Sequence, residues 1–253
     1  MKIGFGFDKY PEEYDYIATF KEVNGLEGEN VIQKHLENEN SIDYCELTLF
    51  RCSIGEKEFL NRFDKESKHY DYSAYIYILS SSGNILTSNF ISGVEVSKIF
   101  KDNNNLNVTI NGWLYPSSKG FYEIAKKRLN NDIKTFGTWK DLSPEKVQGW
   151  LDASIRLGTY SEDVSNKIVS INSNDIDCED KFYCALGESI NGIGGYFGRN
   201  LSALNDCFYG GFGIKENFTL KWLNHEIYKQ KFPEHFKGIL EIFSDNNKTL
   251  ILE

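Results

Sequence analysis

The chain has 253 residues, of which 40% are hydrophobic and 26% charged, enough for one large or two ordinary domains with cores of their own. A formal net charge of −9 argues against nucleic acid or an anionic membrane surface as a direct partner, and is compatible with a basic protein partner. No apolar run approaches the ~18 residues of a membrane span, and the N-terminus lacks a signal-peptide stretch. A cytoplasmic location is therefore expected.

The cysteine, histidine and other potentially catalytic or metal-binding residues form no known catalytic or metal-binding motif. The five cysteines are odd in number and contain no Cys-x-x-Cys, and the four histidines are scattered, so we expect reduced thiols, no metal site and no cofactor. No Gly-x-Ser-x-Gly elbow, Walker loop or His-Glu-x-x-His helix is present, and no enzymatic activity is expected. The candidates that remain have structural interpretations. Cys207 resembles a small buried hydrophobe, His225 and His235 are surface or structural residues, and the acidic cluster of Asp175, Asp177, Glu179 and Asp180 suits the first turn of a helix.

Residues 1–115 have mostly the pattern of strands. Apolar and polar residues alternate, or apolar residues run continuously, in segments bounded by Gly, Asn and Ser. The predicted strands are Lys2–Phe7, Tyr14–Val23, Asp43–Cys52, Tyr72–Leu79, Asn84–Ile91 and Asn107–Tyr115. We expect a loop at Asn24–Ser41, a short helix at Glu56–Arg62, a charged loop at Asp64–His69 and a hairpin turn at Ser80–Asn84.

Helical patterns begin after Pro116. Phe121, Ile124, Ala125 and Leu129 share one helix face, and Ser143-Pro144 is a strong helix start. Val147, Trp150, Leu151 and Ile155 form the buried stripe of that second helix, which Gly158 ends. The polar stretch Thr159–Asn166 then resembles a linker. The sequence therefore predicts a mixed α+β, strand-rich N-terminal domain over residues 1–160.

The pattern of strands and helices in residues 166–253 predicts a second domain of α/β type. The expected elements are a strand at 167–171, helices at 178–190 and 200–209, a strand at 218–222, a helical turn at Asn224–Lys231, a helix at 233–244 and a strand at 248–253. This order with short connections favours a small, largely parallel three-stranded sheet flanked by helices.

The stretch from Gly194 to Gly211 is the most informative part of this domain. A glycine-rich aromatic loop leads to Asn200, a good helix N-cap, and the following helix is expected to end on two glycines. Leu201, Leu204 and Phe208 share one face, which predicts burial. Ser202, Asn205, Asp206 and Tyr209 share the other face. A short helix with such a polar stripe presents a surface to a partner.

The segment Tyr196-Phe197-Gly198-Arg199-Asn200-Leu201-Ser202-Ala203-Leu204-Asn205-Asp206 resembles the barstar family of ribonuclease inhibitors. That family carries Tyr-Tyr-Gly-x-Asn-Leu-x-Ala-Leu-x-Asp, and the likeness continues through Cys207 and Gly210. With the flanking elements it covers about residues 166–253 and says nothing about residues 1–160. The resemblance implies a barstar-like fold and the stoichiometric inhibition of a ribonuclease.

The resemblance also implies which residues meet the partner. The aspartate at the position of Asp206 enters the ribonuclease active site in place of a substrate phosphate and meets arginine, lysine and histidine side chains. Asp245 matches a peripheral salt-bridge residue. The implied partner-binding residues are Tyr196, Gly198, Asn200, Leu201, Ser202, Asn205, Asp206, Gly210 and Asp245.

Each of these residues also has a plainer interpretation. Asp206 and Asp245 could be solvated surface carboxylates. Gly198 and Asn200 could be only a turn glycine and a helix cap. Tyr196 and Phe197 could pack beneath the loop, which is the expected role of Phe197.

Four departures from the family pattern make the face less acidic and less aromatic. Ser202 replaces an aspartate of the family and Asn205 replaces an aromatic residue. Arg199 replaces a glutamate and Gly211 replaces a tryptophan. Three functions remain open. In the first, the protein is the immunity protein of a bacterial ribonuclease toxin, and its basic partner is the cognate ribonuclease. Alternatively it is a barstar-like module with a non-nuclease partner, or an enzyme whose site lies in the N-terminal domain.

Overall fold

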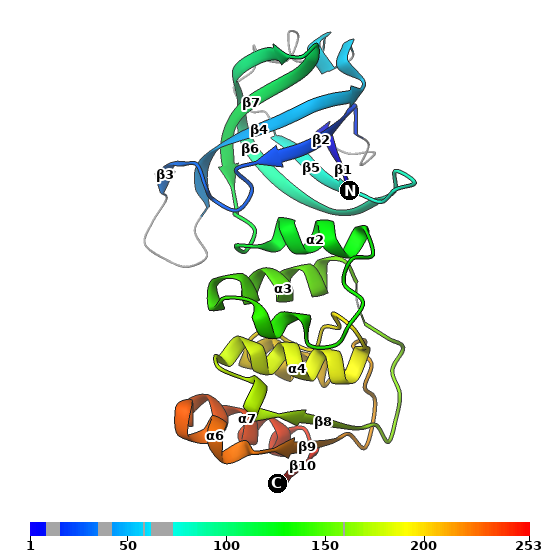
Figure 1. Cartoon of the computed structure of the whole chain (residues 1–253), viewed down its shortest axis with the longest axis vertical. Coiled ribbons are helices and arrows are strands. Elements are labelled where there is room, and N and C mark those ends of the chain that lie inside the picture. The colour runs from blue at the N-terminus through cyan, green and yellow to red at the C-terminus, as the bar shows by residue number, and fades with distance from the viewer. Residues whose placement is uncertain (9–15, 35–41, 58, 62–72, 159) are drawn as a thin grey trace. The chain divides into compact units, whose positions relative to one another are not determined.

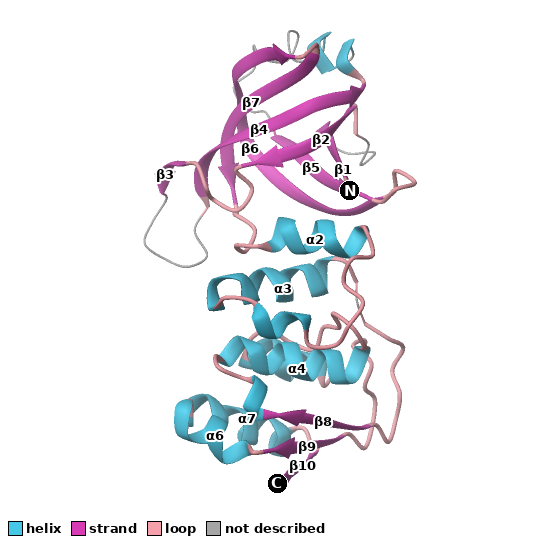
Figure 2. Ribbon diagram, viewed as in Figure 1, coloured by secondary structure: helices cyan, strands magenta, loops and turns pink. Residues whose placement is uncertain are grey.

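The computed structural model describes residues 1–8, 16–34, 42–57, 59–61, 73–158 and 160–253. These form two compact units, an N-terminal unit of Met1–Ser117 and a C-terminal unit of Ser118–Glu253 (Figure 1). Figure 2 shows that strands dominate the first unit, whereas helices surround a small sheet in the second. None of the helices among these residues is long and apolar enough to cross a membrane.

The N-terminal unit is a closed, antiparallel sheet. Its strands lie in the order β2-β1-β5-β6-β7-β4-β3, and an additional pairing of β2 with β4 closes the sheet into a barrel shape. The strands are β1 (Lys2–Phe7), β2 (Ala18–Asn24), β3 (Val31–Lys34), β4 (Asp43–Ile54), β5 (Ser73–Leu79), β6 (Ile85–Asp102) and β7 (Asn105–Leu114). Inside it, the ring of Phe59 meets the rings of Phe5 and Phe20 edge-on, at centroid distances of 5.3 and 5.5 Å.

Two strands of this unit differ from the sequence prediction. β6 has 18 residues, because its first part pairs with β5 and its second part with β7. The change of partner involves register shifts between Ser92 and Glu95 and between Val96 and Lys98, where bulges bend the strand and interrupt its alternation. β3 lies in the segment predicted as a loop. The predicted helix at 56–62 falls partly, and the charged loop at 64–69 wholly, outside the described residues.

The C-terminal unit has the predicted α/β architecture. Its sheet is parallel in the order β10-β9-β8 and is flanked by helices, which confirms the barstar-like fold class. The elements are α2 (Phe121–Leu129), the 3₁₀ helix η1 (Thr138–Asp141), α3 (Pro144–Arg156), β8 (Ile168–Asn172), the 3₁₀ helix η2 (Ser173–Asp175), α4 (Glu179–Asn191), α5 (Leu201–Cys207), β9 (Thr219–Leu223), α6 (His225–Lys231), α7 (Pro233–Asp245) and β10 (Thr249–Leu252).

Helix α4 lies at the centre of this unit and is buried on nearly every side. The eight residues 181–188 are all buried. On one side Phe182 meets Trp222 of β9 at a centroid distance of 5.0 Å, and on the other side α4 packs against α3. Even the polar Lys181 is enclosed, where its Nζ donates to the Lys140 carbonyl at 2.8 Å and to Asp177 at 2.9 Å.

The boundary between the units lies between Ser117 and Ser118, and not at the linker predicted at 159–166. Helices α2 and α3 and η1 therefore cluster with the barstar-like region, whereas the sequence analysis placed them in the domain 1–160. The polar segment near residue 164 is bonded to the loop before β9: Val164 forms a parallel bridge with Ile214, and the Lys215 amide donates to the Val164 carbonyl at 3.2 Å. Its polar composition resembles that of a linker because its bonds to this loop use backbone groups and the Asp163 carboxylate.

This packing changes the fragment that is expected to fold alone. A fragment beginning near Ser165 lacks α3, which packs against α4 in the intact unit, so the fragment exposes the surface of α4 that α3 covers. We expect residues 118–253 to melt cooperatively and residues 165–253 to melt at least about 10 °C lower, which corresponds to a loss of about 2 kcal/mol. Circular dichroism during heating of both fragments measures this. Equal melting temperatures would show that α2 and α3 contribute nothing to the stability of α4.

Candidate protein-binding surface

The loop between α4 and α5 depends on glycines in left-handed conformations. Gly194 has φ 67° and Gly198 has φ 87°, values that other residues rarely adopt. A Cβ atom on Gly198 would lie 2.9 Å from both the backbone nitrogen and the Cα of Leu204. The loop therefore passes directly against the backbone of α5, and a glycine is needed there for its conformation and for space.

Helix α5 begins as predicted and ends earlier than predicted. The Asn200 side chain accepts a hydrogen bond from the Ala203 amide at 2.8 Å, which confirms the N-cap. The helix was expected to reach residue 209 but stops at Cys207. The amides of Phe208 and Tyr209 bond to carbonyls three residues back and form a final turn, and Gly210 then reverses the chain with φ 110°.

The buried face of α5 rests on a cluster of aromatic rings. Leu204, Cys207 and Phe208 are buried, and the Phe208 ring lies 5.3 Å from that of Phe197 and 5.1 Å from that of Phe243. Leu201 is half-buried against α7, where a Cβ on Gly238 would lie 2.7 Å from its Cδ1. Leu201 therefore anchors the helix to α7.

The opposite face of α5 is open to solvent. Ser202 and Asp206 are exposed, and Tyr209 in the following turn is exposed to 79%. Within the described part of the chain, no hydrogen bond or ion pair involves the Asp206 carboxylate. The face thus offers an unneutralised carboxylate beside a large exposed aromatic ring.

Asn205 connects this face to the end of α7. Its Oδ1 accepts a hydrogen bond at 2.8 Å from Nδ2 of Asn246, which also bonds to the Ile242 carbonyl. Asp206 follows Asn205 and the exposed Asp245 precedes Asn246, so the contact brings two exposed carboxylates to one region of the surface. Asn205 itself is half-buried and engaged within the unit.

The two aromatic residues of the loop lie inside the unit. Phe197 is fully buried, as expected. Tyr196 is only 2% exposed, its ring lies 5.7 Å from that of Phe212, and burial raises the pKa of its hydroxyl to about 12. In this conformation Tyr196 supports the loop from below. Gly198 is buried and Gly210 half-buried, whereas Asn200 is exposed.

The sequence analysis did not include Tyr209 among the implied partner-binding residues, and the structure exposes it on the same face as Asp206. Its spacing from Ser202 and Asp206 placed it on the exposed face, but the family motif gives that position no role. A large aromatic residue in the polar stripe of a short helix was the available signal, because aromatic residues are typical anchors of protein interfaces.

The remaining chemical candidates have structural roles. Burial raises the pKa of the Cys207 thiol to about 12, which does not suit a nucleophile. Asp175 is paired with Lys140 and Asp177 with Lys181. Within the residues described above, no group of three or more His, Cys, Asp or Glu side chains is arranged to hold a metal ion.

His235 is held between two buried tyrosines. Its Nε2 lies 2.7 Å from the hydroxyl of Tyr183, and its Nδ1 lies 2.7 Å from the hydroxyl of Tyr228. Burial lowers the pKa of His235 below its ordinary 6.5, while the nearby Glu179 opposes that shift. His235 therefore joins α4, α6 and α7 in its neutral form.

The lowered pKa of His235 predicts a pH-dependent stability. The unfolded chain takes up a proton near pH 6.5 more readily than the folded chain does, so the contribution of His235 is present above that pH and is lost as the pH falls towards the folded pKa. Replacing the imidazole in His235→Gln should make the free energy of unfolding less sensitive to pH over this window. Urea denaturation of both proteins between pH 5 and 8 measures the difference. Identical pH profiles would contradict the prediction.

The close approach at Gly198 gives a second prediction. Gly198→Ala should lower the free energy of unfolding by about 2 kcal/mol or more, because the variant has a strained φ and a methyl group against the backbone of Leu204. Gly158→Ala is the matched control: Gly158 has φ 67°, but no atom lies within 4 Å of its added Cβ. Urea denaturation should show the smaller loss for Gly158→Ala, and equal losses would mean that the loop has space to yield.

Comparison with known proteins agrees with this geometry over part of the chain. Residues 166–250 match the barstar family, which is described as barnase inhibitor. No curated protein matches the chain. The matched segment contains β8, β9, α4 to α7 and the exposed face of α5, and it leaves the N-terminal unit and α2, η1 and α3 outside. Residues 166–250 are thus similar to the barstar family, and the rest of the chain has no such match.

Proposed function

We propose that the protein is a stoichiometric inhibitor of a basic ribonuclease, and not an enzyme, and that it blocks the active site with α5 and the loop before it. The observation that supports this most directly is Asp206. Its carboxylate is exposed on a capped helix, and it has no neutralising partner among the described residues. The family match, whose description names the inhibition of barnase, supports the same class of partner.

The proposed contact has a simple physical basis. A ribonuclease active site gathers cationic groups to bind the phosphates of RNA, and a carboxylate offers the same charge and can accept two parallel bonds from one arginine. Asp206 is the single acidic residue in Leu201–Cys207, because Ser202 stands where the family has another aspartate. The charge recognition by α5 therefore rests on Asp206.

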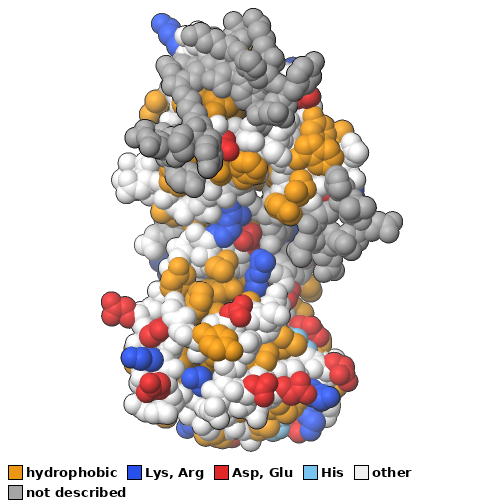
Figure 3. All heavy atoms as spheres, turned by 180° about the vertical axis from the view of Figure 1, so that it is seen from behind, with side chains coloured by type: hydrophobic (Ala, Val, Ile, Leu, Met, Phe, Trp, Pro, Cys, Tyr) orange, Lys and Arg blue, Asp and Glu red, His pale blue; other side chains and the backbone are white. Residues whose placement is uncertain are grey.

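On the face drawn in Figure 3, acidic and basic side chains are interspersed over the C-terminal unit. Interactions between exposed charges are largely screened beyond about 8 Å in physiological salt. We therefore propose that selectivity for a basic partner is local to Asp206, Asp245 and Tyr209.

A cognate toxin is the natural target of such an inhibitor. We propose that the protein is the immunity protein of a bacterial ribonuclease toxin and acts in the cytoplasm, with which its five free cysteines agree. Ser202, Asn205 and Gly211 differ from the family pattern, which supports a target whose surface differs from that of barnase. Co-purification with a basic ribonuclease is the expected result, whereas recovery of a non-nuclease partner alone would favour a different binding module.

The role of Asp206 can be tested by inhibition assays. Asp206→Ala should weaken the complex by about 2–5 kcal/mol, because it leaves cationic groups of the nuclease buried and unpaired; part of the evidence for this range comes from the barnase–barstar pair itself. Asp245→Ala, at the rim, should cost less than about 1 kcal/mol. The measurement is a titration of RNA cleavage with each variant, first with barnase and then with the co-purified nuclease.

Both variants should keep the thermal stability of the parent protein, because both side chains are exposed. If Asp206→Ala inhibits as tightly as the parent protein, α5 is not the blocking element.

A further inference from the structure

Both loops that flank α5 are held by chain that lies outside the barstar match. We call residues 118–165 the brace; they include α2, η1, α3 and the segment after Gly158, apart from Thr159, which is not described. The front loop is 192–199, before α5, and the rear loop is 208–214, after it. The contacts of the brace with each loop centre on one carboxylate.

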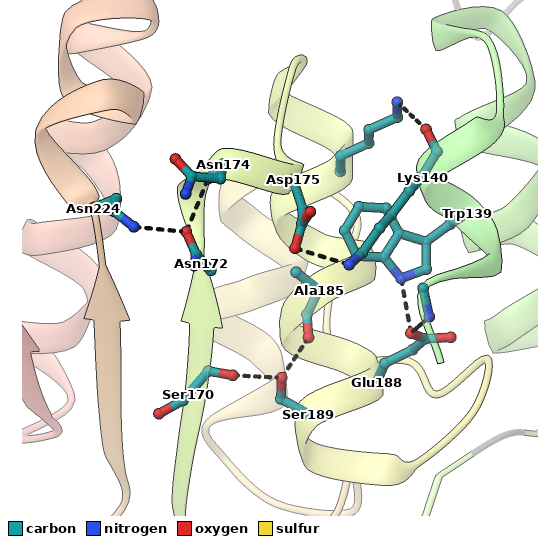
Figure 4. A network of polar contacts seen from close by, with 12 residues as sticks. Trp139, Lys140, Ser170, Asn172, Asn174, Asp175, Ala185, Glu188, Ser189 and Asn224 are labelled. Atoms are coloured by element: carbon teal, nitrogen blue, oxygen red, sulfur yellow. Dashed lines mark hydrogen bonds and ion pairs between the residues drawn. The ribbon is translucent and has the colours of Figure 1, made fainter. Parts of the chain in front are cut away.

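The front loop is joined to the brace through Glu188. This α4 residue is 4% exposed, and its Oε1 accepts a hydrogen bond from the Gly194 amide at 3.0 Å. Its Oε2 accepts from the Trp139 indole Nε1 at 2.8 Å, a bond drawn in Figure 4, and from the Gly137 amide at 2.7 Å. One buried carboxylate thus binds the loop with one oxygen and the brace with the other.

Arg128 of the brace supports the same loop directly. Its Nη2 donates to Ser154 Oγ at 2.7 Å, and its guanidinium lies 4.9 Å from the centre of the Trp150 ring. A Cβ atom on Gly194 would lie only 2.6 Å from that Nη2. The guanidinium therefore lies against the backbone of Gly194.

The rear loop is joined to the brace through Asp163. Its Oδ2 accepts a hydrogen bond from the Gly211 amide at 2.7 Å, and its Oδ1 accepts from the Gly213 amide at 2.9 Å. The ring of Tyr160, three residues earlier, lies 5.3 Å from that of Phe212. Gly211 and Gly213 have positive φ angles of 85° and 90°, and the carboxylate fixes both of these glycine amides with its two oxygens.

Asn191 at the end of α4 joins the brace to both loops. Its Oδ1 accepts from the Ser161 amide at 3.0 Å. Its Nδ2 donates to the carbonyl of Tyr196 in the front loop at 2.7 Å and to that of Phe212 in the rear loop at 3.0 Å. The brace, the front loop and the rear loop therefore share one network of hydrogen bonds.

We propose that the brace holds the two loops in the conformation that presents α5 to its partner, with Glu188 and Asp163 as positioning residues. Glycine-rich loops lose more conformational entropy on ordering than other segments do. A surface ordered before binding loses less freedom when the complex forms, and it binds more tightly for that reason. The consequence for binding rests on the proposed function, whereas the ordering of the loops does not.

Hydrogen exchange of single amides in the full chain tests the ordering. In Asp163→Ala we expect the Gly211 and Gly213 amides to exchange about tenfold faster or more, while amides of β9 keep their rates. Asp163→Asn retains one acceptor oxygen, so one of the two amides should stay slow. Trp139→Phe removes one donor from Glu188 but keeps an aromatic ring, and it should speed exchange at Gly194.

Asp175→Ala is the matched control. Asp175 also bonds across to the brace, through Lys140 Nζ at 2.8 Å (Figure 4), but it contacts neither loop. A general loss of stability would raise exchange throughout the unit in both variants. Unchanged exchange at Gly211 and Gly213 in Asp163→Ala, or a rise no larger than in Asp175→Ala, overturns the proposal.

Titration against barnase and the co-purified ribonuclease then separates the two proposals. A dissociation constant at least about fivefold higher for Asp163→Ala than for the parent protein and Asp175→Ala supports a brace that assists binding. Equal dissociation constants, with the parent protein binding tightly, overturn that role. Faster loop exchange in a chain that binds neither nuclease upholds the ordering role and rejects the inhibitor assignment.

Discussion

The buried carboxylate of Glu188 is the contact on which the arrangement around α5 depends. A charge enclosed in a protein is costly unless hydrogen bonds replace its water. Here three N–H groups do so, from Gly137, Trp139 and Gly194. Because these donors come from η1, from Gly137 immediately before it and from the front loop, the carboxylate is satisfied only when both segments occupy these positions. The need to satisfy the buried Glu188 carboxylate on α4 thus fixes the positions of both η1 and the front loop.

The character of the exposed face follows from how α5 is held. The side chains of Leu204 and Phe208 pack into the aromatic cluster. Ser202, Asp206 and Tyr209 therefore lie on the opposite, exposed side. Asn205 stands where the family has an aromatic residue, and its hydrogen bond to Asn246 gives it a role within the unit. Under the proposed function, these departures from the family pattern leave fewer residues to meet the partner, and recognition rests on Asp206 and its neighbours.

Local patterns predicted much of this structure, and contacts between distant residues account for what they missed. The Asn200 cap, the buried stripe of α5 and the parallel sheet follow from residues a few positions apart. The bond from Trp139 to Glu188 spans 49 residues and that from Gly211 to Asp163 spans 48, and neither has a periodic signal. A polar segment that binds through its backbone and a single carboxylate has the composition of a linker. The sequence analysis therefore placed the boundary at that segment, whereas the compact units divide after Ser117.

The pairing of Asp206 with Tyr209 narrows the chemistry of the partner group. The two residues are three positions apart and are both exposed, Tyr209 almost completely. A carboxylate accepts hydrogen bonds from either lysine or arginine, but the planar guanidinium can also stack on an aromatic ring while it donates two parallel bonds. An ammonium group offers no flat face for such stacking. Under the proposed function, the surface of α5 is therefore better suited to an arginine of the partner than to a lysine.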